Sequence, residues 1–257
     1  MSVFHRGPVK RSFKRPSVTG VTHRQFLFFY PAPARMGVMK LVERAKVSFP
    51  FLQELSGAFR ARLDAEARMV TARKGRGLLS RGDRADGAYL VLAGQLDVYV
   101  IRADGRETTL YRVRGAETCL FALNSVFSGV VYPAWVRVIT EATILLIPGQ
   151  LVRELHEGEK PFRNWAFGVQ SRRIFDLVSA FEEVQTLSLA ERLCSYLVRA
   201  ANGRNEVRET HEQIASYLGT AREVVSRHLH RLAGKGLITQ SRSCITLPDP
   251  RKLSAAG

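Results

Sequence analysis

Four polar side chains that could contact the edges of DNA bases are concentrated in one short segment near the C-terminus. Their spacing places them on one exposed face of a helix: Arg222, Glu223, Ser226 and Arg227. A guanidinium group donates two parallel hydrogen bonds to guanine, a carboxylate accepts from the cytosine amino group, and a hydroxyl does either. In the first turns of a helix, such groups face the major groove. The alternative is a solvated, charged helix face.

Basic side chains close to this segment are suited to hold DNA phosphates. They are His228, His230, Arg231 and Arg242. Thr220, whose hydroxyl comes just before the same helix, is a further candidate contact.

Two capping boxes predict the helices that position these groups. Thr210 with Gln213, and Thr220 with Glu223, each begin a helix, and Gly219 between them ends the first one in the left-handed conformation. The apolar positions at which the two helices would pack on each other are Ile214, Ala215, Leu218, Val225, Leu229 and Leu232. After Gly236, the runs LITQ and CITL flank a turn, which indicates the hairpin of a winged helix-turn-helix.

The charge of the chain favours a polyanionic partner. Its 39 Lys and Arg against 23 Asp and Glu give a formal net charge of +16, which suits nucleic acid or an anionic membrane surface. Residues 1–39 carry seven Lys or Arg and no acid, whereas residues 40–185 carry 21 bases and 17 acids. No apolar run approaches the roughly 20 residues of a membrane span, so we expect none.

The N-terminal segment, residues 1–39, is rich in Arg, Lys, Pro and Ser and lacks helical or strand periodicity. We expect a basic, disordered leader. Two alternatives are a targeting peptide and a start codon assigned too early, since Met36 or Met39 would begin the protein just before its first expected helix.

Short apolar runs separated by turn residues between Met69 and Pro148 predict an all-β roll or barrel. Leu96, Val98 and Val100 alternate with polar positions and lead into Ala103-Asp104-Gly105, which indicates a β-hairpin.

Helical spacing begins near residue 159 and continues to about 185. One face carries Phe162, Ala166, Val169, Leu177, Ala180 and Val184, and is interrupted at Arg173. A second stripe carries Phe167, Ile174, Val178 and Phe181. A helix with two apolar faces can pack on its own domain and also on a second copy, so we expect a dimer helix. A helix buried within one domain is the alternative.

The three cysteines are widely spaced, so they form neither a disulfide framework nor a four-thiolate metal or iron-sulfur site. This usage fits a reducing cytoplasm. Cys194 and Cys244 have the surroundings of packing residues in a helix and a strand.

The sequence resembles the family of the catabolite activator (cyclic-AMP receptor) protein and the fumarate-nitrate reduction regulator over about residues 47–250. TAREVVSRHLHRL is similar to the recognition helix of the family, and GLLSRGDRADGAYLVLAGQLDVYV is similar to its β-roll signature, with Gly82, Asp83, Ala85 and Gly94 in register. AWVRVITEATILLIP matches the strand after the phosphate-binding cassette.

This resemblance implies an α+β protein: a leader (1–39), a cyclic-nucleotide-binding-like double-stranded β-roll sensor (40–158), a dimerisation helix (159–185) and a winged helix-turn-helix (186–257). It implies a bacterial, homodimeric transcription regulator that binds double-stranded DNA and RNA polymerase and responds to a small-molecule effector. The Glu followed by Ser-Arg, here Glu223, Ser226 and Arg227, implies TTGA-type half-sites about one helical turn apart.

The resemblance breaks at the effector site. Cyclic-nucleotide binders of the family carry Arg-Ser or Arg-Thr before an Ala, but here Tyr132-Pro133 precede Ala134. A buried phosphate without a paired cation is costly, so we expect an effector other than cyclic AMP. The candidate pocket residues are Glu117, Cys119 and Tyr132, beside Leu120 and Phe121. An apolar or metabolite effector, haem on Cys119 and His156, and a thiol switch at Cys119 remain alternatives; the missing cysteines disfavour an iron-sulfur cluster.

Two other functions are alternatives to DNA binding. An enzyme in the β-roll cavity would need a catalytic constellation, yet residues 69–148 contain no His and one Cys. A membrane-surface adaptor would use the basic leader.

Overall fold

The computed structural model describes residues 40–241 and 244–255. The expected leader at residues 1–39 and the predicted phosphate contact Arg242 therefore lie outside the described residues. Within the described ranges, no helix is both long and apolar enough to cross a membrane.

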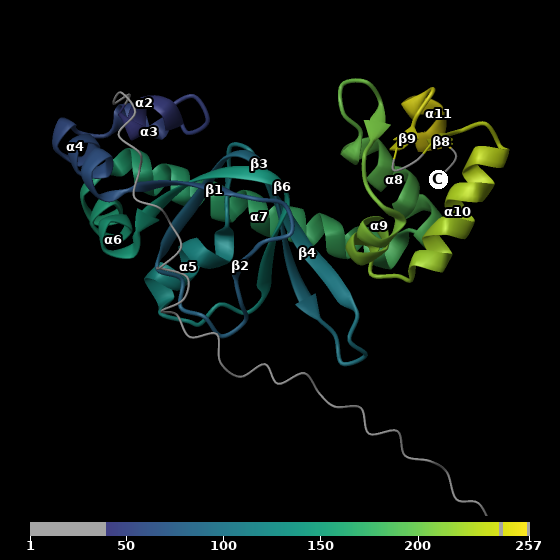
Figure 1. Ribbon diagram of the computed structural model, residues 1–257, viewed down its shortest axis with the longest axis horizontal. Coiled ribbons are helices and arrows are strands. Elements are labelled where there is room, and N and C mark those ends of the chain that lie inside the picture. The colour runs from purple at the N-terminus through teal and green to yellow at the C-terminus, as the bar shows by residue number, and fades with distance from the viewer. Residues whose placement is uncertain (1–39, 242–243, 256–257) are drawn as a thin grey trace, which may run out of the picture. The chain divides into compact units, whose positions relative to one another are not determined.

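An antiparallel β-roll forms the centre of the view in Figure 1. Its sheet has the order β1-β6-β3-β4, with β2 paired to β6 and β5 paired to β3. The strands are β1 (Arg68–Ala72), β2 (Gly77–Leu79), β3 (Gly87–Ile101), β4 (Glu107–Arg114), β5 (Glu117–Thr118) and β6 (Trp135–Pro148). The register of β3 against β6 shifts between Val91 and Leu96, which bends the long strands into the roll. The β-roll predicted from the short apolar runs is confirmed.

Gly94 is required at this bend. Its φ of +89° lies in the left-handed region, and a Cβ there would stand 2.3 Å from the backbone oxygen of Glu141. Only a glycine permits both the conformation and the close approach of β3 to β6.

The hairpin predicted around Ala103-Asp104-Gly105 is confirmed. Strand β3 ends at Ile101, Gly105 has a φ of +82°, and β4 begins at Glu107. The amide of Arg102 donates to the Arg106 oxygen at 2.8 Å, which closes the turn.

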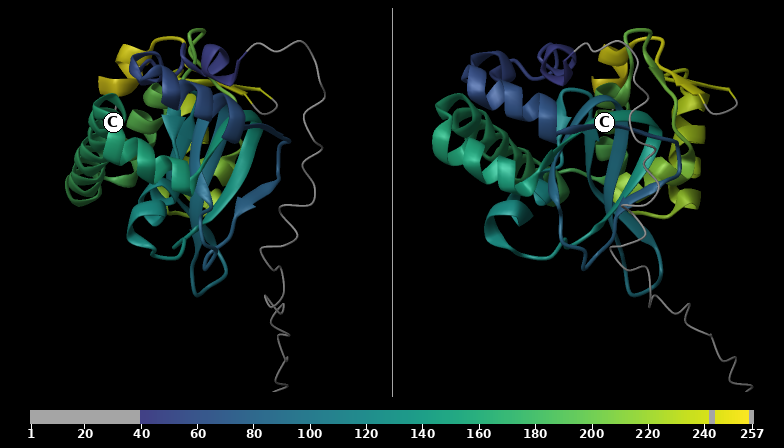
Figure 2. Two further views of the ribbon diagram at one scale, coloured as in Figure 1. Left: turned by 90° about the vertical axis from the view of Figure 1, so that its left-hand side faces the viewer. Right: turned by 60° about the vertical axis from the view of Figure 1, so that its left-hand side comes forward.

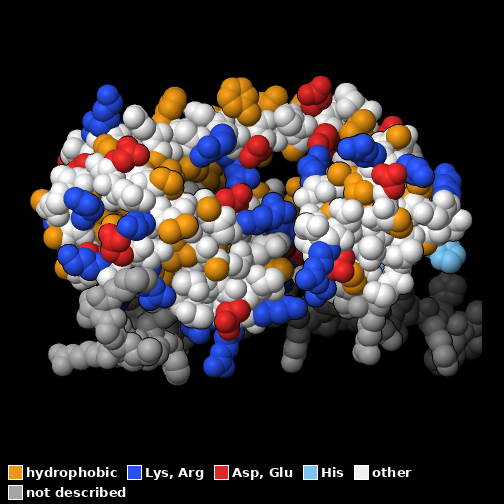
Figure 3. All heavy atoms as spheres, turned by 90° about the horizontal axis from the view of Figure 1, so that it is seen from above, with side chains coloured by type: hydrophobic (Ala, Val, Ile, Leu, Met, Phe, Trp, Pro, Cys, Tyr) orange, Lys and Arg blue, Asp and Glu red, His pale blue; other side chains and the backbone are white. Residues whose placement is uncertain are grey.

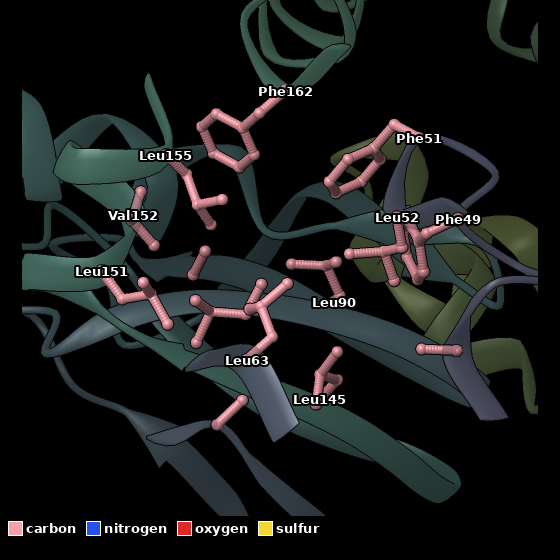
Figure 4. Close-up of a cluster of buried hydrophobic side chains, with 14 of the residues drawn as sticks. Phe49, Phe51, Leu52, Leu63, Leu90, Leu145, Leu151, Val152, Leu155 and Phe162 are labelled. Atoms are coloured by element: carbon pink, nitrogen blue, oxygen red, sulfur yellow. The ribbon is translucent and has the colours of Figure 1, made fainter. Parts of the chain in front are cut away.

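Helices that precede and follow the β-roll in the sequence pack together on it around one apolar core, shown in Figure 4. These helices are α2 (Leu41–Ala45), α3 (Phe51–Glu54), α4 (Gly57–Glu66), α6 (Gly149–Gly158) and the start of α7 (Lys160–Thr186). Phe51 stacks on Trp165 of α7 with ring centroids 4.5 Å apart, and Phe162 is fully buried. Burial of such aromatic side chains fixes the beginning of the long helix on the roll.

A second core fills the inside of the roll, where β3, β4 and β6 face α5 (Leu120–Ser128). Its side chains include Cys119 and Tyr132.

The long helix predicted near residues 159–185 is observed as α7, with 27 residues. Its two apolar faces differ along its length from the prediction. Phe162 and Ala166 are buried and Val169 packs on the roll, whereas the C-terminal half leaves both stripes open. The large exposed members are Phe167, Ile174, Leu177, Val178, Phe181 and Val184, and Phe175, which belongs to neither predicted stripe, is exposed as well. In the left view of Figure 2, α7 is the teal-to-green helix at the left edge. Figure 3 looks at the molecule from above and shows hydrophobic side chains protruding along its upper edge, which is the same side of the molecule.

The sequence indicated that Arg173 interrupts the apolar face of α7. In the structure it is part of the packing, because its guanidinium carbon lies 4.4 Å from the centroid of the Tyr111 ring on β4. The side chain is largely buried and forms a cation–π contact between α7 and the roll.

The C-terminal elements follow α7 and share a third core. They are α8 (Leu189–Ala200), β7 (Glu206–Val207), α9 (His211–Leu218), α10 (Arg222–Gly234), β8 (Thr239–Ser241), β9 (Cys244–Thr246) and α11 (Pro250–Ala255). The small sheet has the order β7-β9-β8, so the wing hairpin predicted after Gly236 is observed.

Candidate nucleic-acid interface

The first predicted capping box is present and begins α9. Thr210 Oγ1 accepts from the Gln213 amide at 3.2 Å, and Gln213 Oε1 accepts from the Thr210 amide at 2.8 Å. Gly219 ends the helix with a φ of +68°, as its position predicted. The Thr210 capping box and Gly219 therefore do what the sequence predicted: they satisfy the backbone groups at the two ends of α9.

The second predicted capping box is wrong. Helix α10 begins at Arg222 with Ala221 as its N-cap, and no side chain caps it. The Thr220 amide instead donates to the Ala215 oxygen at 3.0 Å, next to the left-handed Gly219. Thr220 thus belongs to the end of α9, because the glycine turn extends one residue further than the pattern indicated.

The core between the two helices agrees with the apolar pattern. The fully buried residues are Ile214, Ala215, Leu218, Val225 and Leu229, and Leu232 is partly buried. With this face of α10 buried, its opposite face must point outward.

Three of the four predicted base-contacting side chains are exposed on the first turns of α10: Arg222, Glu223 and Arg227. In the part of the chain that the structure describes, none of the three forms an ion pair. Their charges are therefore available to a ligand. Figure 1 shows α10 along the edge of the C-terminal elements, away from the β-roll.

Ser226 differs from the other three. It is half-buried, and its Oγ lies 2.8 Å from Nδ1 of His211, the first residue of α9. His211 is not among the residues predicted from the sequence. Its position directly after the N-cap Thr210 is the one signal that could have found it, since this residue starts the first helix of the motif.

The predicted phosphate contacts are not equivalent. His230 and Arg231 are exposed, but Arg231 Nη2 lies 2.8 Å from Nδ1 of the half-buried His228. Burial, followed by the charges of Arg231 and Arg227, lowers the pKa of His228. The neutral ring that results is a weaker phosphate ligand than an arginine.

A cavity of about 430 Å³ lies where the two helices of the motif meet the wing. Its lining residues come from the start of α9, the start of α10 and the wing strands: Glu209, Thr210, His211, Glu212, Arg222, Gln240, Ser241, Cys244 and Ile245. Arg222 and His211 thus share one polar surface.

The candidate effector residues of the β-roll are only partly brought together. Cys119 Sγ lies 3.0 Å from the Tyr132 hydroxyl and 3.8 Å from that of Tyr111, and all three residues are buried. Burial raises the pKa of the Cys119 thiol despite these hydrogen bonds. Phe121 packs edge-on against both tyrosine rings.

Glu117 and His156 do not join this cluster. Glu117 Oε2 accepts from the Arg114 amide at 2.8 Å and so serves the local turn before β5. His156, on α6, is exposed and packs against Phe127 at a centroid distance of 4.9 Å.

A buried charge cluster that the sequence analysis missed joins the β-roll to the helix-turn-helix. Arg112 of β4 contacts Asp97 of β3 at 2.9 Å, Glu209 before α9, and the Tyr196 hydroxyl of α8 at 2.5 Å. The Tyr196 hydroxyl in turn donates to Glu209 Oε2 at 2.5 Å. Burial raises the pKa of Asp97, although Arg112 opposes this. Both parts belong to the same compact unit of the chain.

A second contact lies nearby, where Thr109 Oγ1 on β4 and Ser216 Oγ on α9 are 3.0 Å apart. The Arg112 guanidinium carbon also lies 5.3 Å from the centroid of the Tyr217 ring on α9. Strand β4 therefore holds the first helix of the motif through polar and aromatic contacts.

Comparisons with known proteins agree with this architecture. The model of the cyclic nucleotide-binding domain matches residues 69–159, and that of the Crp-like helix-turn-helix domain matches residues 191–256. The chain is similar to the structure of a transcriptional regulator of the crp/fnr family from Eubacterium rectale, with 27% identity, a TM-score of 0.71, and coverage of 81% of this chain and 98% of the other. No curated protein matches the sequence.

Two further solved structures share the fold. FixK2 from Bradyrhizobium japonicum is 17% identical with a TM-score of 0.65, over 74% of this chain and 96% of its own. The c-di-GMP responsive global regulator CLP from Xanthomonas campestris is 20% identical with a TM-score of 0.64, over 75% of this chain and 99% of its own.

A β-roll of the nucleotide-binding type, followed by a long helix and a winged helix-turn-helix, defines a DNA-binding regulator with a sensor-type domain. The chain belongs to the Crp/Fnr family of transcription regulators. Members of this family regulate transcription and are not enzymes.

Proposed function

We propose that the protein is a homodimeric transcription factor of the cytoplasm that binds a palindrome with two TTGA-like half-sites, under control of an effector other than cyclic AMP. The observation that carries this proposal is the exposed, unpaired set Arg222, Glu223 and Arg227 on the first turns of α10. RNA polymerase is the partner that the family implies.

The exposed half of α7 supports the dimer. Phe167, Phe175 and Phe181 are 73%, 71% and 67% exposed, and apolar side chains of this size seldom stand open along a whole helix. A second copy of α7 would cover them and set the two recognition helices on successive major grooves about one turn apart.

The interior of the roll supports an effector other than a cyclic nucleotide. Tyr132, at the position where the resemblance expects Arg, is fully buried and contacts Cys119. A phosphate brought here would meet two phenols and a thiol, while Arg173, the guanidinium that contacts this cluster from α7, lies against the face of the Tyr111 ring. The phosphate would therefore lose its hydration with little compensation. An apolar or metabolite effector fits this surface better.

Strand β4 is the route by which such an effector would act on DNA binding. Tyr111 and Arg112 are adjacent in β4, so their side chains point to opposite faces. Tyr111 contacts Cys119 inside the roll and Arg173 on α7, whereas Arg112 contacts Glu209 and Tyr196 next to the helix-turn-helix. A ligand that moves β4 would thus displace both the dimer helix and the DNA-binding helices.

The test is selection of bound sequences from random duplex DNA, followed by binding measurements with Arg227→Ala. We expect a palindrome with TTGA-like halves and a loss of about 1–3 kcal/mol in specific binding for this variant. Arg60→Ala, which removes an exposed Arg on α4, is the matched control and should bind as the parent does. Equal discrimination between sites by Arg227→Ala and Arg60→Ala would refute the assignment.

A further inference from the structure

The hydroxyl of Ser226 is already engaged before any DNA arrives. Its Oγ lies 2.8 Å from Nδ1 of His211, across the gap between α10 and α9. A serine hydroxyl has one hydrogen to donate and two lone pairs to accept with. If the Ser226 hydroxyl donates its hydrogen to His211, it can only accept from a base; if it accepts from His211, its hydrogen remains available to a base.

The His211 ring determines the direction of this hydrogen bond. If Nδ1 carries no proton, it accepts the single Ser226 hydrogen, and Ser226 then offers only lone pairs to DNA. If Nδ1 is protonated, it donates to Oγ, and the Ser226 hydrogen is free to point outward. In the first state Ser226 matches the amino groups of adenine and cytosine; in the second it matches guanine N7 and O6 or thymine O4.

The surroundings of His211 place this choice at the DNA surface. The half-buried ring lines the cavity of about 430 Å³ shared by α9, α10 and the wing. The titratable and charged groups that line the same cavity are Glu209, Glu212, Arg222 and Cys244. Of these groups, Glu209 is paired with Arg112.

We propose that His211 is a positioning residue that sets the hydrogen-bond polarity of Ser226, so that a doubly protonated His211 presents Ser226 to DNA as a donor. This inference rests on the proposed function, because it requires that Ser226 contacts a base. On this proposal, part of the base preference of α10 is determined by His211, a side chain of α9.

The experiment measures base preference as a function of pH. Full-length protein is titrated with duplexes that carry each of the four base pairs at every position of the selected half-site, between about pH 6 and 8. The readout is the ratio of dissociation constants between duplexes. A uniform effect of pH on phosphate contacts cancels from this ratio.

For the parent protein we expect preference for an acceptor base at one position to fall as the pH rises, by roughly threefold or more over this range. A single linked proton can change it by at most about tenfold per pH unit. In His211→Asn, the amide can still bond Oγ but does not titrate, so the ratio should be independent of pH. In Ser226→Ala, the ratio should also be independent of pH, even if overall affinity still varies with pH.

His156→Asn is the matched control, since it removes an exposed His of α6 outside the helix-turn-helix, and should keep the pH profile of the parent. A ratio in His211→Asn that follows the parent profile would overturn the proposal, as would a pH-dependent ratio in Ser226→Ala. Ser226→Ala keeps His211 and so decides the matter even if His211→Asn folds poorly. Because Arg227→Ala tests DNA recognition independently, failure of this inference is distinguishable from failure of the proposed function.

Discussion

Cys119 shows how burial and function interact at the level of one residue. Its side chain is buried, its Sγ contacts Tyr132 at 3.0 Å, and burial raises the pKa of its thiol. The nucleophile in alkylation and oxidation is the thiolate, and this site disfavours it. A redox switch at Cys119 would therefore require the roll to open.

Alkylation with iodoacetamide tests this directly. In native protein near neutral pH, we expect Cys244 at the wing, which is only half-buried, to be modified well before Cys119. Both should react at comparable rates after unfolding in denaturant. Peptide mass spectrometry gives the two rates, and modification of native Cys119 as fast as Cys244 would contradict the structure and revive the thiol switch.

Single residues were also where sequence reasoning was weakest. Arg222, Glu223 and Arg227 follow from the period of a helix, because the opposite apolar face is readable from the sequence. The Arg112 cluster and the His211–Ser226 contact join residues 97, 112 and 209, or 211 and 226, which no local period connects. Such contacts depend on tertiary placement and only the structure gives them.

Helix ends illustrate the next scale, since two threonines of similar context behave differently. Thr210 caps α9, whereas Thr220 does not cap α10, because the left-handed Gly219 draws the Thr220 amide back to Ala215. Sequence motifs correctly predicted the two helices of the motif and the wing hairpin after them, in that order. They did not predict that the turn after Gly219 would include Thr220, so that Ala221 becomes the N-cap of α10.

Gly219 provides a measurement of this turn. A Cβ at Gly219 would meet nothing within 4 Å, so the cost of Gly219→Ala is conformational alone. For a left-handed residue this cost is about 1–2 kcal/mol in the free energy of unfolding. Gly203→Ala is the control, since its Cβ also meets nothing and its φ is outside the left-handed region. Urea denaturation should separate the two variants, and equal midpoints would mean that the turn tolerates a side chain.

The assembly of the whole molecule depends on the open half of α7. Sequence periodicity indicated two apolar stripes but not that the roll would cover only the first turns of the helix. That division follows from where Phe162 and Trp165 pack against Phe51, which is a property of the folded chain.

Phe181→Glu tests the role of this surface. A charge buried within an apolar dimer interface is strongly unfavourable, so we expect the variant to sediment as a monomer at concentrations where the parent is a dimer. Ser179→Glu places the same charge on an exposed position of the same helix and should remain a dimer. Sedimentation equilibrium distinguishes the two, and a dimeric Phe181→Glu would remove α7 as the interface.

Because the Arg112 cluster is buried, the molecule has two kinds of electrostatic contact that differ in their sensitivity to ionic strength. The side chains of Arg112 and Asp97 are only 2% and 3% exposed, so mobile ions have almost no access to the pair. The exposed arginines of α10 meet the counterion atmosphere of DNA directly, and their attraction weakens as salt is added. Concentrated salt should therefore release the protein from DNA, while the contact between the helix-turn-helix and the β-roll stays intact.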